Sequence, residues 1–298
     1  MSMRKIWLSL FLLVGFCAAY AEHLDVTTSY IYSSDFNQLR AGAAVPISYY
    51  ASIGLEGKYV EDKSPAANNG FMNPVYSVYL PIQINLETAH FDLAPFYYFE
   101  NKSQLTPFRK ANAYGLHAQL TMDLVQDEVE DKHTQAYMAA SYVRQKANVQ
   151  TDNLWHHQYY DQAAFTLGVR QNFYNAFIFQ ADGTAFQYSD GISRVQNFYG
   201  MVDQKDLAFT QSFDVNRSLG KYTLSARITR LWPEQRSSLY VGYHYAEFYT
   251  ADPQHSILVG NTFYVMKNAY VDIAFNHLQT TSNQNKRDLF FVNLNMAF

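Results

Sequence analysis

Cysteine and long apolar runs are what this chain most conspicuously lacks. Its 298 residues include a single cysteine, Cys17, and a single extended apolar run at residues 6–16. No later stretch reaches the 18 or more apolar residues that a membrane-spanning helix needs, which excludes a helical membrane protein. Without further cysteines, a disulfide framework is excluded as well, so stability must come from backbone pairing or a large core.

Charge is also scarce. Lysine and arginine number 22 against 26 acidic residues, and the net charge of −4 excludes a broad basic surface for nucleic acid. Charged residues make up 16% of the chain, whereas soluble domains average about a quarter. Aromatic residues reach 17%, with 25 Tyr and 22 Phe, yet the mean hydropathy stays at −0.25. This combination is typical of a β-barrel with an apolar outer face and a polar inner face.

The first 21 residues have the pattern of a secretory signal peptide. Arg4 and Lys5 precede the apolar run, and Ala19-Tyr20-Ala21 offers a small-x-small cleavage site. We therefore expect cleavage near Ala21, which leaves residues 22–298 as one domain without cysteine. Lipidation of Cys17 is the alternative, and the bulky Phe16 before it argues against that modification.

Apolar and polar side chains alternate in short segments along the rest of the chain. Residues 114–124 are the clearest case, because every second side chain from Tyr114 to Leu124 is apolar and His117 and Asp123 lie on the other face. Successive side chains of a strand point to opposite sides, so the pattern predicts strands with one apolar face. The expected fold is therefore all-β.

Fifteen such segments can be counted, although a single-chain bacterial barrel normally has an even number. An Asp-Gly turn signal at Asp190-Gly191 favours a hidden strand near residues 192–201, and hence sixteen strands. Fourteen strands, with one segment counted in excess, is the close alternative.

Joints near residues 61–70, 101–111, 147–158 and 280–287 are expected to be longer loops at one end of a barrel. Tight turns are expected at the other end, near residues 48–50, 171–173 and 267–268. Pro95 lies inside a predicted strand, where its missing N–H predicts a bulge.

The C-terminal segment carries the most specific signal. Its apolar face consists of alternate residues that end in a terminal aromatic: Phe290, Val292, Leu294, Met296 and Phe298. Such a strand resembles the closing strand of bacterial, porin-like outer-membrane β-barrels, which the barrel-assembly machinery reads. The resemblance implies a membrane-spanning antiparallel up-and-down β-barrel of 14–16 strands in a Gram-negative outer membrane, with the membrane lipids and that machinery as partners.

A soluble β-sandwich or β-propeller would also alternate and would bury its apolar faces in a core. Two observations weigh against these folds. Aromatic residues gather toward the strand ends, as in the interfacial girdles of membrane barrels. No period of about 40 to 50 residues repeats, as a propeller would require.

Candidate functional residues are the charged and histidine side chains expected to face the lumen. The selected positions are Asp92, His117, Asp123, Arg170, Asp182, Asp214, Arg227, His244 and Asp272. Facing acidic and basic walls would orient polar solutes in a pore. Alternatively, these charges pair with each other and hold the wall together, and the sequence leaves both interpretations open.

The favoured function is a passive channel for small polar solutes, without a cofactor or a metal site. A plugged structural or adhesive barrel is one alternative, and a barrel lipid hydrolase is another. Against a hydrolase, no serine follows His244 or His277 two residues later, and no G-x-S-x-G motif occurs. Adjacent His156 and His157 point to opposite sides of an extended chain, so they are a poor metal chelate.

Overall fold

The protein was analysed as a computed structural model. It describes residues 24–34, 36–62, 75–102, 108–127, 132–151, 154–173, 176–189, 220–232, 234, 236–249, 252–281 and 286–297. The signal-peptide region and Asp214 lie outside this part of the chain, as does Phe298. Among the described residues, no helix is long and apolar enough to cross a bilayer.

Fifteen β-strands make up the described structure. They are β1 (Asp25–Tyr32), β2 (Phe36–Ser48), β3 (Ala51–Asp62), β4 (Val75–Tyr79), β5 (Ile82–Asn85), β6 (Ala89–Lys102), β7 (Phe108–Asp127), β8 (Lys132–Thr151), β9 (Leu154–Phe173), β10 (Phe177–Tyr188), β11 (Gly220–Trp232), β12 (Ser237–Phe248), β13 (Gln254–Met266), β14 (Ala269–Thr280) and β15 (Lys286–Ala297).

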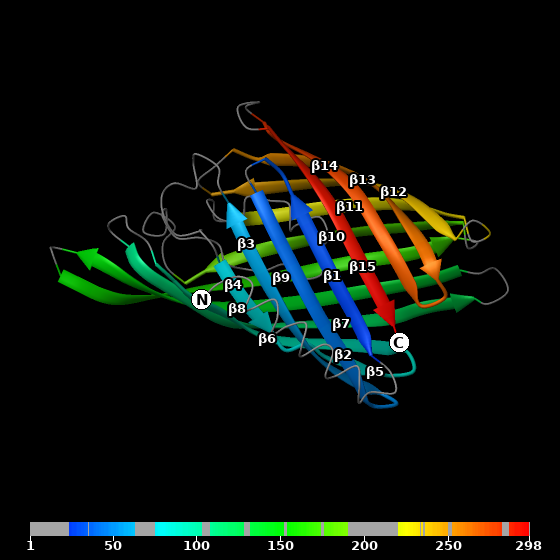
Figure 1. The fold of residues 1–298 in the computed structure, drawn as a ribbon, viewed down its shortest axis with the longest axis horizontal. Coiled ribbons are helices and arrows are strands. Elements are labelled where there is room, and N and C mark those ends of the chain that lie inside the picture. The colour runs from blue at the N-terminus through cyan, green and yellow to red at the C-terminus, as the bar shows by residue number, and fades with distance from the viewer. Residues whose placement is uncertain are drawn as a thin grey trace.

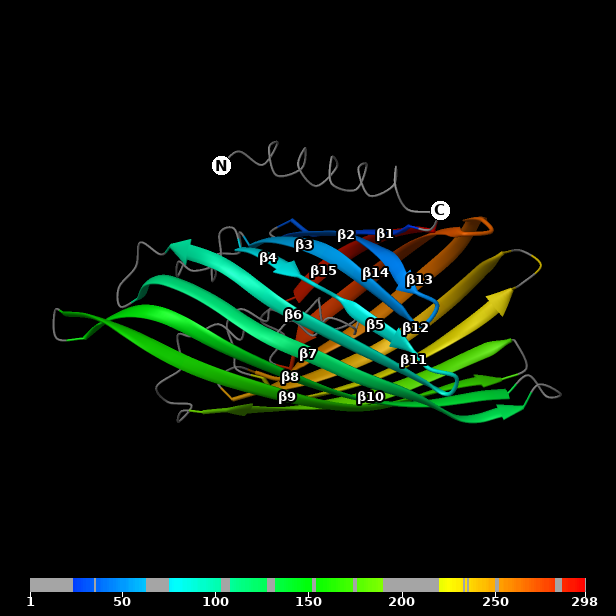
Figure 2. The same cartoon turned by 90° about the horizontal axis from the view of Figure 1, so that it is seen from below.

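The strands close into a barrel. Neighbours in sequence pair antiparallel around the wall, and β1 pairs with both β2 and β15, so the sheet has no free edge (Figures 1 and 2). Strands β4 and β5 both lie between β3 and β6, one following the other, and share one position in the wall. The wall therefore has fourteen positions, which confirms the all-β antiparallel barrel at the lower end of the expected strand number.

The favoured count of sixteen was too high because β10 pairs directly with β11, from Phe177 opposite Arg230 to Ala185 opposite Tyr222. The two segments expected between β10 and β11, residues 192–201 and 207–215, lie outside the described residues. An apolar alternation alone does not say whether a segment joins the barrel.

Proline explains the break between β4 and β5. Pro95 on β6 is in register with Leu116 on β7 without the expected bulge. The irregularity lies instead on the other side of β6, where the neighbouring strand is interrupted at Leu80–Pro81 and Leu80 N–H donates to the Pro95 carbonyl at 3.0 Å. Since proline has no N–H to donate, the ladder cannot continue regularly past it.

The tight turns form one end of the barrel, which we call the turn end. Tyr49–Tyr50 and Lys267–Asn268 are two of its turns, and β1 starts there while β15 ends there. At the opposite end, which we call the loop end, the expected loop at residues 147–158 is instead a continuation of β8 and β9. This β8–β9 hairpin projects beyond the neighbouring strands (Figure 2).

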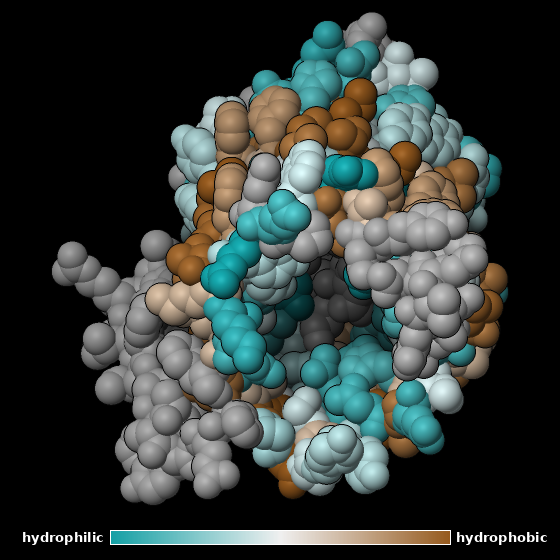
Figure 3. Space-filling view, turned by 90° about the vertical axis from the view of Figure 1, so that its right-hand side faces the viewer, coloured by the Kyte–Doolittle hydropathy of each residue, from teal (hydrophilic) through white to brown (hydrophobic). Residues whose placement is uncertain are grey.

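The two faces of the wall differ as the alternation predicts. On β15, Phe290 is 54% exposed on the outside, whereas its neighbour Phe291 is 5% exposed and points inward. Apolar side chains cover the outside and hydrophilic residues line a hollow at one end (Figure 3). The apolar part of the outer surface of β9 ends at Asp161, whose carboxylate forms a two-point ion pair with Arg144 of β8, both bonds at 2.8 Å.

Candidate functional site: the barrel lumen

The lumen is the site where the predicted functional residues come together. All of those that the structure describes lie on the inner face of the wall, because their strand neighbours are the exposed apolar side chains of the outer surface: Asp92, His117, Asp123, Arg170, Asp182, Arg227, His244 and Asp272. Their inward orientation agrees with the alternation, while their roles stay predictions.

Two of the lumenal aspartates are held by the same three-strand arrangement. On β8, Tyr137 crosses Gly168 of β9, and its hydroxyl donates to Asp182 Oδ2 on β10 at 3.1 Å. A Cβ added to Gly168 would lie 2.1 Å from Tyr137 Cζ. Glycine is therefore required there, because the aromatic ring lies directly against the backbone. Ser225 of β11 donates a second hydrogen bond to Asp182.

The second arrangement lies four strands further on. Tyr240 of β12 crosses Gly260 of β13, where a Cβ would be 2.3 Å from Tyr240 Cζ. The Tyr240 hydroxyl contacts both oxygens of Asp272 on β14 at 2.9 Å, and Thr262 and Asn293 donate to the same carboxylate at 3.1 Å. Asp182, through its Oδ2 atom, and Asp272, through both oxygens, are thus bound to the wall by neutral donors, and these contacts tie neighbouring strands together.

A row of polar side chains crosses the inner face of β7 to β11. The strand register places Asp123, Gln135, Arg170, Gln180 and Arg227 side by side on consecutive strands. Asp123 accepts hydrogen bonds from Gln135 at 2.9 Å and contacts His133 Nε2 at 2.7 Å. The row therefore has an acidic end on β7 and two guanidinium groups on β9 and β11.

A cavity of about 440 Å³ opens toward the turn end and is lined by residues of β1 to β3, β5 to β7, β14 and β15. Arg40 and Glu56 form an ion pair of 2.7 Å on its wall. Asp92 accepts a hydrogen bond from Gln83 at 3.0 Å, and His117 Nδ1 lies 2.7 Å from Ser141 Oγ. In this part of the lumen, charged and polar groups largely satisfy each other.

His244 is the predicted lumenal residue that is least accessible. Its side chain is 0% exposed, as is that of Asn276, and the neighbouring Ser256 donates to Asn276 Oδ1 at 2.7 Å. A fully buried imidazole does not meet a solute in the lumen, so burial argues against His244 as a selectivity residue.

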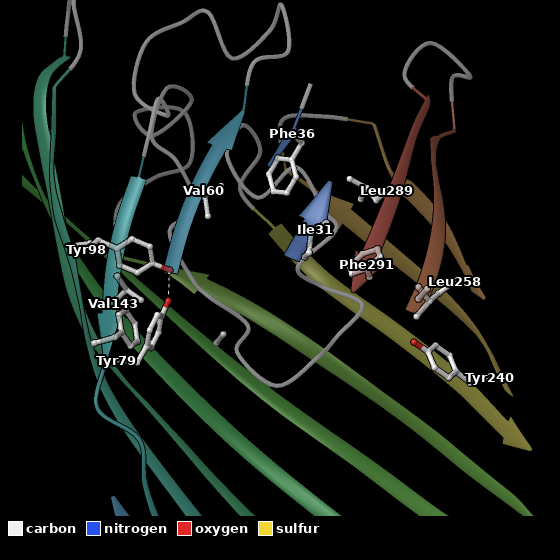
Figure 4. Close-up of a cluster of buried hydrophobic side chains, with 14 residues drawn as sticks. Ile31, Phe36, Val60, Tyr79, Tyr98, Val143, Tyr240, Leu258, Leu289 and Phe291 are labelled. Atoms are coloured by element: carbon white, nitrogen blue, oxygen red, sulfur yellow. Dashed lines mark hydrogen bonds between the residues drawn. The ribbon is translucent and has the colours of Figure 1, made fainter. Parts of the chain in front are cut away.

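The lumen also contains an apolar cluster that the alternation did not predict. Ile31, Val60, Leu289 and Phe291 all point inward and are buried, although none of these four was predicted to line the lumen. In Figure 4, Tyr79, Tyr98 and Val143 lie on one side of the barrel, and Ile31, Phe36, Leu289 and Phe291 lie across from them. Leu289 and Phe291 could have been recognised, since they occupy the inward positions of the C-terminal strand.

Three buried aromatic residues narrow this region, namely Tyr79, Phe96 and Tyr98. The hydroxyls of Tyr79 and Tyr98 are 2.9 Å apart, and the Tyr79 and Phe96 rings lie 5.4 Å apart between centroids (Figure 4). The polar row of β7 to β11 borders the apolar cluster at Tyr240, whose ring lies 3.7 Å from the Arg227 guanidinium carbon, and this row is the part of the inner face suited to hydrophilic solutes.

Features of an enzyme site are limited in the described residues. The His117–Ser141 pair lies on the lumenal wall and not on the lipid-facing surface, where a barrel lipid hydrolase would need it. His277, on the outer face, contacts Asp288 at 2.7 Å. No group of three or more His, Cys, Asp or Glu side chains suited to a metal ion occurs in the part of the chain that the structure describes.

Comparison with known proteins relates the chain to outer-membrane barrels through its fold. No protein-family model matches the sequence, and no curated protein matches it. Among solved structures, it is similar to CymD, a monoaromatic hydrocarbon channel, with a TM-score of 0.57 and 9% identity over 97% of this chain and 92% of that one. It is also similar to CdiB from Acinetobacter baumannii, with a TM-score of 0.55 and 10% identity over 93% of this chain and 60% of that one. At these identities the likeness concerns the fold, and that fold is a closed outer-membrane β-barrel.

Proposed function

We propose that the protein is a passive, porin-like channel of a Gram-negative outer membrane that admits small polar solutes. The observation that carries the proposal is a closed fourteen-position barrel with an apolar outside and a charged inner row on β7 to β11. A barrel of this size with charged side chains along its inner face provides a hydrophilic pathway for solutes.

The proposal divides the lumenal residues by their contacts. Asp123, Arg170 and Arg227 line the polar row and would set selectivity, because charged side chains in a pore favour solutes of opposite charge. Asp182 and Asp272 are tied to tyrosines and would hold the wall. Asp92, His117, Asp214 and the fully buried His244 complete the predicted set. CymD conducts hydrocarbons by its name, but that solute class does not suit a row of charges.

Export and membrane insertion are part of the same proposal. Cleavage near Ala21 would release the barrel domain of residues 22–298 into the periplasm. The outward-facing Phe290, Val292, Leu294 and Met296 of β15, followed by Phe298, would then present the closing strand to the barrel-assembly machinery and later contact lipid. This pathway calls for no cofactor, no nucleic acid and no catalytic group.

Single-channel recording in planar bilayers tests the function directly. Purified, folded protein should produce discrete conductance steps in potassium chloride. A heat-denatured sample of the same preparation is the control and should produce none. Folded protein that inserts without conductance at any voltage would contradict the channel and favour the plugged structural barrel, for which the buried apolar cluster in the lumen is the supporting observation.

A further inference from the structure

The outer surface of β7 to β10 contains a groove of about 700 Å³. Its floor consists of outward-pointing alanines, one on each of the four strands: Ala118, Ala140, Ala163 and Ala185. Larger exposed side chains stand at its sides, namely Leu116, Tyr142 and Phe165. We call this feature the alanine groove. Its volume is that of a small-molecule site, since such sites measure about 300–1,000 Å³.

The alanine groove lies in the half of the apolar outer surface that is nearer the loop end. On β8, the outward side chains are apolar from Ala136 to Tyr142. Polar Thr134 precedes this stretch and Arg144 follows it. The strand from Thr134 to Arg144 is about 34 Å long, or about 26 Å along the membrane normal at a tilt of about 40°, which matches the apolar band of about 25 Å in outer-membrane barrels. Ala140 therefore lies near the middle of the bilayer, and the groove extends from there toward the loop end.

Charged groups follow the groove toward the loop end at two successive levels of the outer surface. The first level is the Arg144–Asp161 ion pair, directly beyond Tyr142. The second level holds Lys146, whose ammonium nitrogen lies 5.9 Å from the centroid of the Tyr159 ring. Lys146 makes no ion pair with any residue that the structure describes. Since Asp161 neutralises Arg144, Lys146 supplies the net positive charge beside the groove.

The groove and the lysine are spaced like the two parts of a lipid. Lys146 follows Ala140 by about 20 Å along the strand, which is about 15 Å in depth at the same tilt. One leaflet of the hydrocarbon core is also about 15 Å thick. Lys146 therefore lies at the level of the headgroups when an acyl chain occupies the groove, and its ammonium group is the complement of a phosphate.

A second copy of the barrel suits this surface less well than a lipid does. Stable protein interfaces bury about 800 Å² on each partner and require matching shapes. Tyr142 and Phe165 stand out on either side of the groove, so a rigid barrel wall would rest on these rings and leave the alanines uncovered. A flexible hydrocarbon chain can fill the space between them.

We propose that the alanine groove and Lys146 form a binding site for one membrane lipid with an anionic phosphate headgroup. The site lies on the outer surface and goes beyond the channel proposal. It rests on insertion of the barrel into a membrane, but it does not require that the lumen conducts.

Native mass spectrometry of the detergent-purified barrel tests the headgroup, with phosphatidylglycerol and phosphatidylcholine of identical acyl chains as probes. Wild-type protein should retain one phosphatidylglycerol and bind phosphatidylcholine about fourfold more weakly, because a unit charge about 5 Å away in water changes an anion's affinity by about that factor. Lys146→Gln should remove this preference. Lys286→Gln is the matched control, because Lys286 also lies on the outer face at the loop end, but on β15. Equal binding of both lipids by wild-type protein, or loss of the preference in both variants, would overturn the site.

A second pair of variants tests the groove itself. Ala163→Phe places a ring between Tyr142 and Gln187 and should abolish retention of the lipid, because the acyl chain loses its space. Ala226→Phe is the control, since Ala226 lies on the outer face of β11 between the exposed Leu224 and Ile228 and does not line the groove. Ala163→Leu is a smaller replacement that should also reduce retention, which keeps the test valid where the phenylalanine variant does not fold. Equal retention by wild-type protein and Ala163→Leu, or equal losses in Ala163→Phe and Ala226→Phe, would overturn the site.

The same spectra distinguish the occupants of the groove. Dimers of the wild-type barrel that disappear in Ala163→Phe would assign the groove to a second copy of the chain and overturn the lipid. Planar-bilayer recording separates this proposal from the channel. Retained lipid without any conductance would contradict the channel and sustain the lipid site, whereas conductance without retained lipid would do the reverse.

Discussion

At the scale of single residues, the lumen depends on contacts between aromatic rings and glycine. Tyr137 over Gly168 and Tyr240 over Gly260 repeat one arrangement, in which a tyrosine crosses a glycine strand and binds an aspartate on the next strand. The glycine removes the side chain that would otherwise lift the ring from the wall. Each arrangement ties three strands together through side chains, in addition to the backbone ladder.

Substitution of Gly260 by alanine should lower the stability of the folded barrel. The new Cβ would lie 2.3 Å from Tyr240 Cζ and 2.7 Å from Ala274 Cβ, so the ring must move away from Asp272. We expect a loss of about 1–3 kcal/mol, the usual cost of overpacking. The measurement is urea unfolding in detergent, followed by tryptophan fluorescence.

Two further variants make the Gly260 prediction specific. Gly183→Ala is the control, because its Cβ meets only Leu224 Cδ2 at 3.1 Å and Thr223 O at 3.6 Å, so we expect a smaller loss. Tyr240→Ala should reduce the cost of a subsequent Gly260→Ala, since it removes the contact with the ring and leaves only the contact with Ala274 Cβ. Additive losses in the double variant would contradict the proposed contact.

At the scale of the strand, β15 illustrates how one element faces two environments. Val292 is 45% exposed on the outer face, while Asn293 points inward and donates to Asp272. Val292→Lys should therefore lower the free energy of unfolding of the barrel by about 2–4 kcal/mol, because this is the cost of placing a lysine at mid-membrane depth. Asn293→Lys places the same charge in the lumen beside the Asp272 carboxylate and should lower the free energy of unfolding much less. Heat-modifiable migration in gels measures the folded fraction, and equal folded fractions would contradict the assigned faces.

The direct pairing of β10 with β11 leads to a prediction about their connection. Residues 190–219 link two strands that already meet, and the Tyr188 hydroxyl donates to the Gly220 carbonyl at 3.0 Å. Replacing residues 190–219 by a short glycine-containing turn should leave the barrel able to fold, because shortening a connection between adjacent ends costs little. Circular dichroism and heat-modifiable migration check this outcome. Loss of the folded barrel would mean that the wall requires this segment.

At the scale of the whole molecule, the two ends of the barrel should face different compartments. The longer connections of outer-membrane barrels are extracellular and the short turns periplasmic, so the loop end should face outward. Cleavage after Ala21 would leave no native cysteine, so single cysteines can be labelled cleanly. A membrane-impermeant maleimide should label Thr281→Cys on intact cells and Asn268→Cys only after permeabilisation. The reverse result would invert the topology, and labelling of neither would contradict outer-membrane insertion.

Local alternation was sufficient to predict the faces of most strands. Tyr114 and Leu116 were assigned to the outside and His117 and Asp123 to the inside, and the structure agrees. Every one of these assignments follows from backbone geometry, since consecutive strand side chains point in opposite directions. The same rule failed to count the strands, because it favoured further strands between β10 and β11 and these two strands pair directly with each other.

The inner face was harder to predict than the outer face. Asp272 was recognised as lumenal, but its three donors lie on β12, β13 and β15 and were not identified. Inward apolar residues such as Ile31 were likewise missed, since a strand does not reveal what its inward side chains will meet across the barrel. Arg170 and Arg227 were both predicted to face the lumen, but the sequence did not show that they lie at the same level of the wall.

The amino-acid sequence alone determined the class of fold, the apolar outer surface and the orientation of the selected charges. These follow from a period of two residues, which acts within each strand. Only the tertiary structure decided the fourteen positions of the wall, the tyrosine–glycine–aspartate contacts and the polar row of β7 to β11. The physical reason is closure: once β1 pairs with β15, one common register fixes which side chains of distant strands lie at the same level.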